Sequence, residues 1–241
     1  MKAKLPALPL LAIASLMLAA LPAAAKIDMV VMDARGVKLQ QGQVIDGSAN
    51  LTLTDGQQVS LMMQDGRVIK LKGPFDKPPA PAEASATANV QLALQLLVTQ
   101  QSSRERAGVI RGGPGMVVPP EPWVVDVSSG GLRCLQTDST ITLWRPDASS
   151  AAPVEVAPTD RSWKAAVTWE KGSDHLALPH NVPVSRRTAY VVRMDNKDVN
   201  ITLVSLPTSL SNDAMRAAFM MDNGCDAQAK ALFTKAGLTA P

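Results

Sequence analysis

Apolar and polar residues alternate in short runs between residues 28 and 75, and glycines separate these runs. Alternation with a period of two is typical of strands that have one buried face. Two pairs, Asp55-Gly56 and Asp65-Gly66, stand between such runs and are typical of tight hairpin turns. The pattern therefore predicts a small antiparallel meander. Its buried face is expected to contain Leu51, Leu53, Val59, Leu61, Val68, Ile69 and Leu71.

The period changes to that of a helix further along the chain. The proline-rich run 77–81 comes first and favours an extended linker. A helix is then predicted over about residues 86–102, because leucines and valines recur there at helical spacing. We expect this helix to pack on the protein's own β domains, since its polar side carries little basic charge for a membrane. A second Pro/Gly-rich linker follows it.

Strand-like alternation returns at Trp123 and continues to about residue 206. The spacing of these runs favours a β-sandwich over alternating strands and helices. Four tryptophans lie in or beside the runs and are expected to fill the core of this domain. The candidate strands are 123–127, 131–136, 141–144, 153–156, 163–169, 189–193 and 199–206.

The last part of the chain has the pattern of a helical hairpin. Asn212 is placed to cap a helix that runs to Met220 or Met221. Asn223-Gly224 is expected to end that helix, and a second one is predicted over 225–235.

The expected fold class is therefore mainly β with minor α. Residues 1–25 are predicted to be a signal peptide, and 26–76 a small β meander domain. Residues 77–121 are expected to be a linker with one helix. Residues 122–241 are expected to form a β-sandwich-like domain with C-terminal helices.

The first 25 residues determine the expected compartment. Two lysines precede the apolar run 5–21, and an Ala-x-Ala site ends at Ala25. This order is typical of an export signal cleaved between Ala25 and Lys26, which predicts a periplasmic or secreted protein. The alternative is an uncleaved membrane anchor, because the run is nearly long enough to span a bilayer. Pro6 and Pro9 favour cleavage.

Charge and composition exclude several classes of partner. Without the two leader lysines, basic and acidic side chains are nearly equal in number, which argues against binding to nucleic acid. Aromatic residues make up only 3% of the chain, too few for a carbohydrate or single-strand stacking surface. No second long apolar run follows the leader, so we expect no membrane span after its removal.

The chain contains two cysteines, Cys134 and Cys225. In an oxidising compartment such a pair is most simply a disulfide. Closing a loop of about 90 residues would stabilise the fold by roughly 4–5 kcal/mol. A reactive thiol or a metal ligand is the alternative, but there is no CxxC spacing and no neighbouring histidine.

A pattern that begins Leu39-x-x-Gly42-x-Val44 and ends Val68-x-x-Leu71-x-Gly73-Pro74-Phe75 runs through the first β region, and this region resembles the FecR-type domain of bacterial periplasmic proteins. In that family the domain is a β-rich periplasmic module, and well-known members relay a receptor signal across the inner membrane to a sigma factor. No cytoplasmic segment precedes the apolar run here, so the relay role is not expected. The residues that carry the resemblance are Leu39, Gly42, Val44, Gly47, Leu51, Leu53, Asp55, Gly56, Val68, Leu71, Gly73, Pro74 and Phe75.

Candidate catalytic groups are few. His175 and His180 are the only histidines, and we interpret both as loop residues of the surface. Asp174 and His175 are adjacent, so their side chains are expected to diverge on a strand instead of forming a pair. Ser173 or Ser185 with His180 would be needed for a hydrolase triad, and the local sequence does not bring them together.

Methionines cluster at 29 and 32, at 62 and 63, and at 220 and 221. Thioether ligands select copper(I), but adjacent methionines point in different directions and do not chelate one ion together. We therefore interpret them as core residues. The sequence predicts no catalytic residue, no cofactor and no metal.

Three functions are consistent with this pattern. The favoured one is an exported, non-enzymatic binding or scaffold module that recognises another protein of the bacterial envelope. An accessory protein of an envelope-sensing signalling system is the second, and it rests on the FecR-type resemblance. A periplasmic hydrolase or metal-handling protein is the third. The oligomeric state is left open.

We predict that the exported chain begins at Lys26, because signal peptidase cleaves after small residues at an Ala-x-Ala site. Intact-mass measurement on protein purified from the cell envelope tests this. Retention of residues 1–25 would contradict the prediction and favour the membrane anchor.

Overall fold

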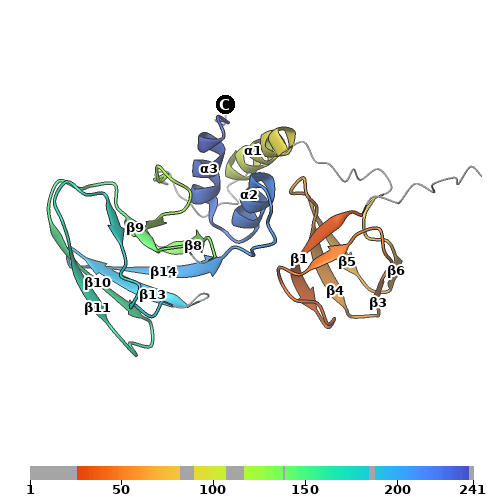
Figure 1. Ribbon diagram of the computed structural model, residues 1–241, viewed down its shortest axis with the longest axis horizontal. Coiled ribbons are helices and arrows are strands. Elements are labelled where there is room, and N and C mark those ends of the chain that lie inside the picture. Colours follow the sequence, from red (N-terminus) through yellow and green to blue (C-terminus); the bar gives the residue numbers. More distant parts are fainter. Residues whose placement is uncertain (1–25, 82–89, 107–116, 138, 185–187, 239–241) are drawn as a thin grey trace, which may run out of the picture.

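The computed structural model describes residues 26–81, 90–106, 117–137, 139–184 and 188–238. Two β units lie on either side of a group of three helices (Figure 1). The mainly β fold with minor α is therefore confirmed. Residues 1–25, the predicted signal peptide, and the first residues of the expected helix, 86–89, lie outside the described residues.

The N-terminal β unit consists of a four-stranded and a two-stranded sheet, both antiparallel. The larger sheet has the order β2-β1-β4-β5 and the smaller one pairs β3 with β6. Met29, Val31 and Leu61 are fully buried in the core between them. The strands are β1 (Asp28–Arg35), β2 (Val44–Asp46), β3 (Leu51–Leu53), β4 (Gln58–Met62), β5 (Val68–Lys72) and β6 (Phe75–Lys77).

One of the two predicted hairpins is present and the other is not. The Asp65-Gly66 turn joins β4 to β5, with Met62 opposite Val68, as predicted. The Asp55-Gly56 turn connects β3 to β4, but these strands belong to different sheets, so the continuous meander was a wrong prediction. The physical reason is that β1 and β5 already occupy both edges of β4.

Gly73 shows why the chain leaves β5 at this point. Its N–H donates to the carbonyl oxygen of Gln57 at 2.9 Å. A Cβ atom on Gly73 would overlap with the carbonyl oxygen of Thr54. Only glycine allows this close approach of two backbone segments, and the chain then continues to β6, beside β3.

The C-terminal β unit is a sandwich of a five-stranded and a three-stranded sheet. The larger sheet has the order β11-β10-β13-β14-β8 and the smaller one β12-β9-β7. One apolar core, which includes Leu143, Val154 and Ile201, contains residues of both sheets. The strands are β7 (Val125–Asp126), β8 (Gly131–Leu135), β9 (Thr142–Trp144), β10 (Ala152–Pro158), β11 (Ala165–Trp169), β12 (His175–Ala177), β13 (Ala189–Met194) and β14 (Lys197–Ser205).

Each of the seven predicted strands of this unit overlaps with an observed strand, and β12 is an additional one. The prediction that all four tryptophans fill the sandwich core is correct only in part. Trp169 is fully buried there, and Trp163 packs beside Tyr190 with ring centroids 5.9 Å apart. Trp123 instead packs against the helices, because it precedes the first strand of the sandwich.

The three helices are α1 (Val90–Arg106), α2 (Asp213–Asp222) and α3 (Asp226–Lys235). The cap at Asn212 is confirmed, since its side-chain oxygen accepts the N–H of Met215 at 2.9 Å. Helix α1 ends four residues later than predicted and packs mainly on α2, not on the β domains. The reason is that α2 offers a wide apolar surface, in which Ala214, Ala217 and Ala218 allow close approach.

The helices and the N-terminal sheet share one apolar core. Val30, Met62 and Val68 lie side by side on neighbouring strands and face the helices. The opposite face of the same strands lines the core of the β unit, where Val31 and Leu61 are fully buried. One end of this sheet is therefore buried on both faces, which joins the β unit firmly to the helices.

Among the described helices, none combines the length and the apolar character that crossing a bilayer requires.

We predict that Gly66→Ala destabilises the protein more than Gly56→Ala does. Both glycines have φ near +78°, so the backbone strain of the substitution is matched. A Cβ on Gly66 would lie 3.0 Å from the carbonyl oxygen of Ala214 and 3.1 Å from Leu97, whereas nothing lies within 4 Å at Gly56. We expect a difference of about 1–3 kcal/mol in the free energy of unfolding, measured by urea denaturation. Equal losses for the two variants would contradict the packing of this turn on the helices.

Candidate functional site

The residues before α2 hold the N-terminal β unit by polar contacts. The hydroxyl of Ser209 donates to the carbonyl oxygen of Gly42 at 2.8 Å. The side-chain amide of Asn212 donates to the carbonyl oxygen of Gln64 at 3.1 Å. Gly42 has φ +84°, and a Cβ there would lie 2.9 Å from the Pro207 ring. Gly42 thus lies at the contact between the N-terminal β unit and the segment before α2.

Cys134 and Cys225 form the predicted disulfide, with their Cα atoms 5.9 Å apart. Both residues are buried, one on β8 and the other at the start of α3. The bond closes a loop with a sequence separation of 91 that contains most of the sandwich. It therefore fixes the helical layer to the edge of the larger sheet.

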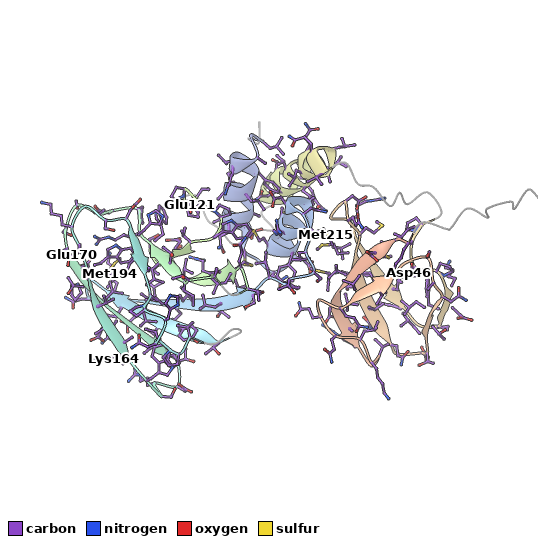
Figure 2. The ribbon with its side chains drawn as sticks, viewed as in Figure 1. Asp46, Glu121, Lys164, Glu170, Met194 and Met215 are labelled. Atoms are coloured by element: carbon purple, nitrogen blue, oxygen red, sulfur yellow. A yellow bond between two sulfur atoms is a disulfide. The ribbon has the colours of Figure 1, made fainter. Side chains whose placement is uncertain are left out.

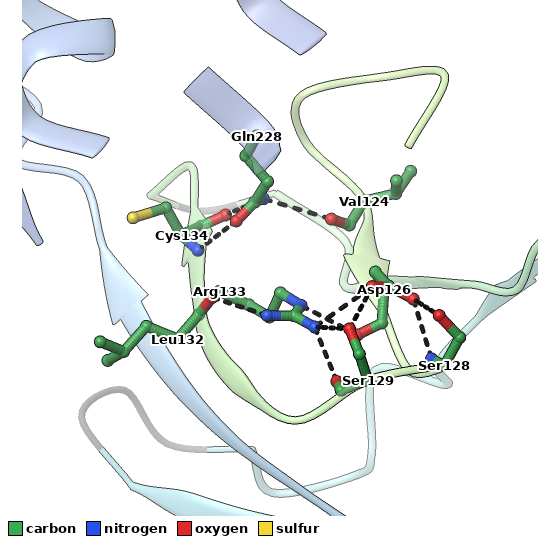
Figure 3. A network of polar contacts seen from close by, with 8 residues as sticks. All are labelled: Val124, Asp126, Ser128, Ser129, Leu132, Arg133, Cys134 and Gln228. Atoms are coloured by element: carbon green, nitrogen blue, oxygen red, sulfur yellow. Dashed lines mark hydrogen bonds and ion pairs between the residues drawn. The ribbon is translucent and has the colours of Figure 1, made fainter. Parts of the chain in front are cut away.

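Gln228 of α3 reinforces the same attachment (Figure 3). Its side-chain amide accepts the N–H of Cys134 at 2.6 Å and donates to the carbonyl oxygen of Cys134 at 2.7 Å. The same amide nitrogen also donates to the carbonyl oxygens of Pro122 and Val124, at 2.8 and 3.2 Å. Because β8 is an edge strand, this glutamine takes the place of a neighbouring strand at Cys134.

A buried ion pair fixes the turn that leads from β7 to β8. Arg133 Nη2 lies 3.2 Å from Asp126 Oδ2, and both side chains are less than one tenth exposed. Burial lowers the pKa of the Arg133 guanidinium, while the charge of Asp126 and its hydrogen bond oppose that change. Arg133 also donates to the carbonyl oxygens of Asp126, Ser129 and Leu132. The turn that connects the two sheets is therefore held by charge-assisted hydrogen bonds.

Asp126 completes this network from the other side. Its carboxylate accepts the N–H and the hydroxyl of Ser128, at 2.8 and 2.6 Å, and the hydroxyl of Ser129 at 2.9 Å. The buried charges of Asp126 and Arg133 are thus paired and hydrogen-bonded, as burial of ions requires.

Arg145 has a similar role directly after β9, whose Trp144 is opposite Asp126 of β7. Its guanidinium lies 4.8 Å above the ring of Trp169. It donates to the carbonyl oxygens of Ser150, Glu170 and Ser173, so it ties β9 to two loops. Sequence reasoning did not single out Arg133, Arg145 or Gln228. The signal that could have identified them is a charged or amide side chain within or next to an otherwise apolar run of strand or helix residues.

His180 lies in a turn after β12, as the loop interpretation expected, whereas His175 is the first residue of β12, so the loop interpretation is wrong for His175. His180 is exposed, and the side chain of His175 is 35% exposed. The expected divergence of Asp174 and His175 is wrong, since Asp174 Oδ1 lies 2.7 Å from His175 Nδ1. The reason is that Asp174 lies in a bend before the strand, where side chains do not alternate. This hydrogen bond lowers the pKa of the Asp174 carboxyl.

Among the described residues, Ser173 does not form the suggested hydrolase group with His180. The hydroxyl of Ser173 donates to the carbonyl oxygen of His175, not to a ring nitrogen. Ser185 lies outside the described residues. Within the described ranges, no three His, Cys, Asp or Glu side chains gather where they could hold a metal ion.

The methionine pairs lie in the apolar cores. Met62 packs against the helices, and its neighbour Met63 lies in the core of the N-terminal β unit. Met220 and Met221 belong to the core that includes all three helices. The interpretation as core residues is confirmed for the six clustered methionines, all of which are buried.

No protein-family model matches this chain, and neither does any curated protein sequence. A functional interpretation therefore rests on the contacts within the chain. Ser209, Asn212 and the shared apolar core connect the N-terminal β unit to the helices. Gln228 and the disulfide connect the helices to β8, and the Asp126–Arg133 pair fixes the turn between the two sheets of the sandwich.

We predict that Gln228→Leu destabilises the protein by about 2–4 kcal/mol, because the buried backbone groups of Cys134, Pro122 and Val124 lose their partner. Urea unfolding under non-reducing conditions, with the disulfide intact, measures this. Gln100→Leu on the exposed side of α1 is the matched control and should change stability by less than about 0.5 kcal/mol. A Gln228 variant as stable as this control would show that the amide does not hold β8.

Proposed function

We propose that this protein is an exported, non-enzymatic binding or scaffold module of the bacterial envelope. The observation that carries the proposal is the continuous apolar core between the two β units. It runs from Val30 and Met62 of the N-terminal sheet through the helices to Cys134 of the sandwich. A core of this kind keeps two preformed surfaces in one relative orientation, which is what a scaffold needs.

The buried disulfide supports the expected compartment. Disulfides persist in oxidising spaces such as the periplasm, and Cys134–Cys225 attaches a helix to a sheet in the interior. Together with the leader-like first 25 residues, it supports export to the periplasm or the medium.

The proposed partner is another envelope protein. The balanced charge of the mature chain gives little attraction for nucleic acid. Two exposed leucines on α1, Leu92 and Leu96, are 54% and 61% accessible and lie one helical turn apart. An apolar strip on the helix that joins the two units suits contact with a protein surface.

A role as accessory of an envelope-sensing system is the second candidate. It is favoured by the FecR-type pattern, whose Gly42 contacts the Pro207 segment. A conformational change in the N-terminal β unit would therefore alter the contacts of the segment that leads into α2. A membrane-bound sensor encoded beside this protein would favour signalling over scaffolding.

We predict that His175→Gln combined with His180→Gln retains function. The tagged, mature double variant should capture the same envelope proteins as the wild type. It should also be exported normally and complement a deletion strain. Stability should fall by no more than about 1 kcal/mol. Loss of complementation with normal export and unchanged thermal stability would overturn the non-enzymatic proposal and direct attention to chemistry at Asp174-His175.

The scaffold part of the proposal has its own control. Gly66→Val should weaken capture of partners that contact both β units, because the turn can no longer pack on α1 and α2. Gly56→Val should retain them, because a Cβ at Gly56 has no neighbouring atom within 4 Å. The test requires that Gly66→Val weakens the packing of the N-terminal β unit on the helices. If both variants then capture the same partners equally, function does not depend on a fixed orientation of the two β units.

A further inference from the structure

The edge strands of the described sheets differ in how they are protected from pairing with another strand. At β8, Gln228 occupies the edge groups of Cys134. At β5, the exposed lysines Lys70 and Lys72 oppose edge-to-edge contact. The edges at β2, β7 and β12 are at most three residues long. Strand β11 has none of these features.

Strand β11 (Ala165–Trp169) is an uncharged edge of five residues without proline. It pairs with β10 on one side, and it lies at the end of the larger sheet opposite to β8 (Figure 1). Ala166 and Thr168 are exposed. An unprotected edge of this length is a template for a further strand.

The hydrogen-bond pattern shows which backbone groups face this edge. The N–H of Thr159 donates to the carbonyl oxygen of Ala189 at 3.0 Å, so odd-numbered residues of β10 bond to β13. Even-numbered residues, such as Val154, must then bond to β11, where Val154 is opposite Val167. By the same alternation, the N–H and C=O groups of Ala166 and Thr168 point away from β10, toward the open edge.

We propose that two copies of this protein associate through β11, antiparallel, with the two-fold axis at Val167. In this register Ala166 of one copy is opposite Thr168 of the second copy. Each such pair exchanges two backbone hydrogen bonds, and symmetry repeats it, so all four edge-facing groups of each strand are satisfied. The two five-stranded sheets become one continuous sheet.

Charged side chains favour this register over the registers in which the two-fold axis is shifted by one residue. Lys164 and Glu170 lie at opposite ends of β11 (Figure 2), and both are exposed. With the axis at Val167, Lys164 is opposite Glu170 of the second copy, and the pair occurs twice. Moving the axis by one residue places Lys164 opposite Thr168 or Gly172 of the second copy, and neither carries a charge.

Lys164 lies on the outer face of the sheet, together with the edge residues of β11. Ala166 is opposite Glu155, which binds Lys164 at 3.1 Å, and Ala166 and Thr168 alternate with Val167, which packs on the core. The side chain of Lys164 is 60% exposed, so its ammonium group can be shared between Glu155 and Glu170 of the second copy. A second copy is thus self-complementary in hydrogen bonding and in charge, which is why it is the occupant we propose.

Sedimentation velocity of the mature protein, from dilute solution to about 1 mM, tests this association, since a short edge contact forms a weak dimer. Thr168→Pro should weaken it at least about tenfold, because the N–H lost faces only the edge and the monomer keeps its bonds to β10. Lys70→Pro is the matched control, since Lys70 also faces an open edge, that of β5. It should leave the association unchanged.

A charge exchange tests the register without proline. Lys164→Glu and Glu170→Lys should each weaken the dimer, because like charges then face each other across the axis. The double variant Lys164→Glu/Glu170→Lys should restore it. Circular dichroism and thermal unfolding confirm that each variant is folded.

Two results would overturn the proposal. One is a wild-type protein that remains monomeric at every concentration, which would leave the β11 edge for a strand of another protein. The other is a dimer that Thr168→Pro and both charge reversals leave unchanged, which would place the contact elsewhere. Either result leaves the scaffold proposal to its own capture test.

Discussion

The double burial of one sheet is the constraint on which the rest of this structure depends. In β1, four consecutive residues from Met29 to Met32 are buried, which a strand allows only when both of its faces are covered. Val30 and Met32 face the helices, whereas Met29 and Val31 face the core of the β unit. Each fully buried side chain of this size contributes about 1.5–3 kcal/mol, so the helices and the N-terminal sheet stabilise each other.

Polar side chains complete the attachment where apolar packing cannot. The side chain of Gln228 can be buried because its amide forms hydrogen bonds with four backbone groups. Its oxygen accepts one N–H, and its nitrogen donates to three carbonyl oxygens. The Asp126–Arg133 pair is tolerated for the same reason, since each charge is surrounded by hydrogen-bond partners. Such groups add little net stability when intact, but they are costly to leave unpaired. Gln228 therefore favours one arrangement of helix and sheet, and the Asp126–Arg133 pair favours one conformation of the turn between β7 and β8.

The two edges of the larger sheet differ in whether their backbone groups are covered by the chain itself. A glutamine from α3 covers part of the β8 edge, so the helical layer both joins the two β units and protects a strand. At the far end of the same sheet, β11 has no such cover. One sheet therefore has an edge occupied by its own chain and an edge with open backbone groups, and the two ends have different physical roles.

Local patterns in the sequence determined much of the secondary structure. Alternation and turn residues located the strands of the sandwich, and Asn212 and Asn223-Gly224 marked the limits of α2, because these signals act over a few neighbouring residues. The disulfide also followed from composition, since two cysteines in an oxidising compartment have one simple pairing.

Only the tertiary structure decided which strands pair and what α1 covers. The turn at Asp55-Gly56 has the local chemistry of a hairpin, but β4 already has two neighbours, so β3 pairs with β6 instead. The contacts of Gln228 and of Arg133 depend on residues that are close in space through the fold of the whole chain. Sequence alone fixes local conformation, while competition among distant segments for the same edges and faces decides the architecture.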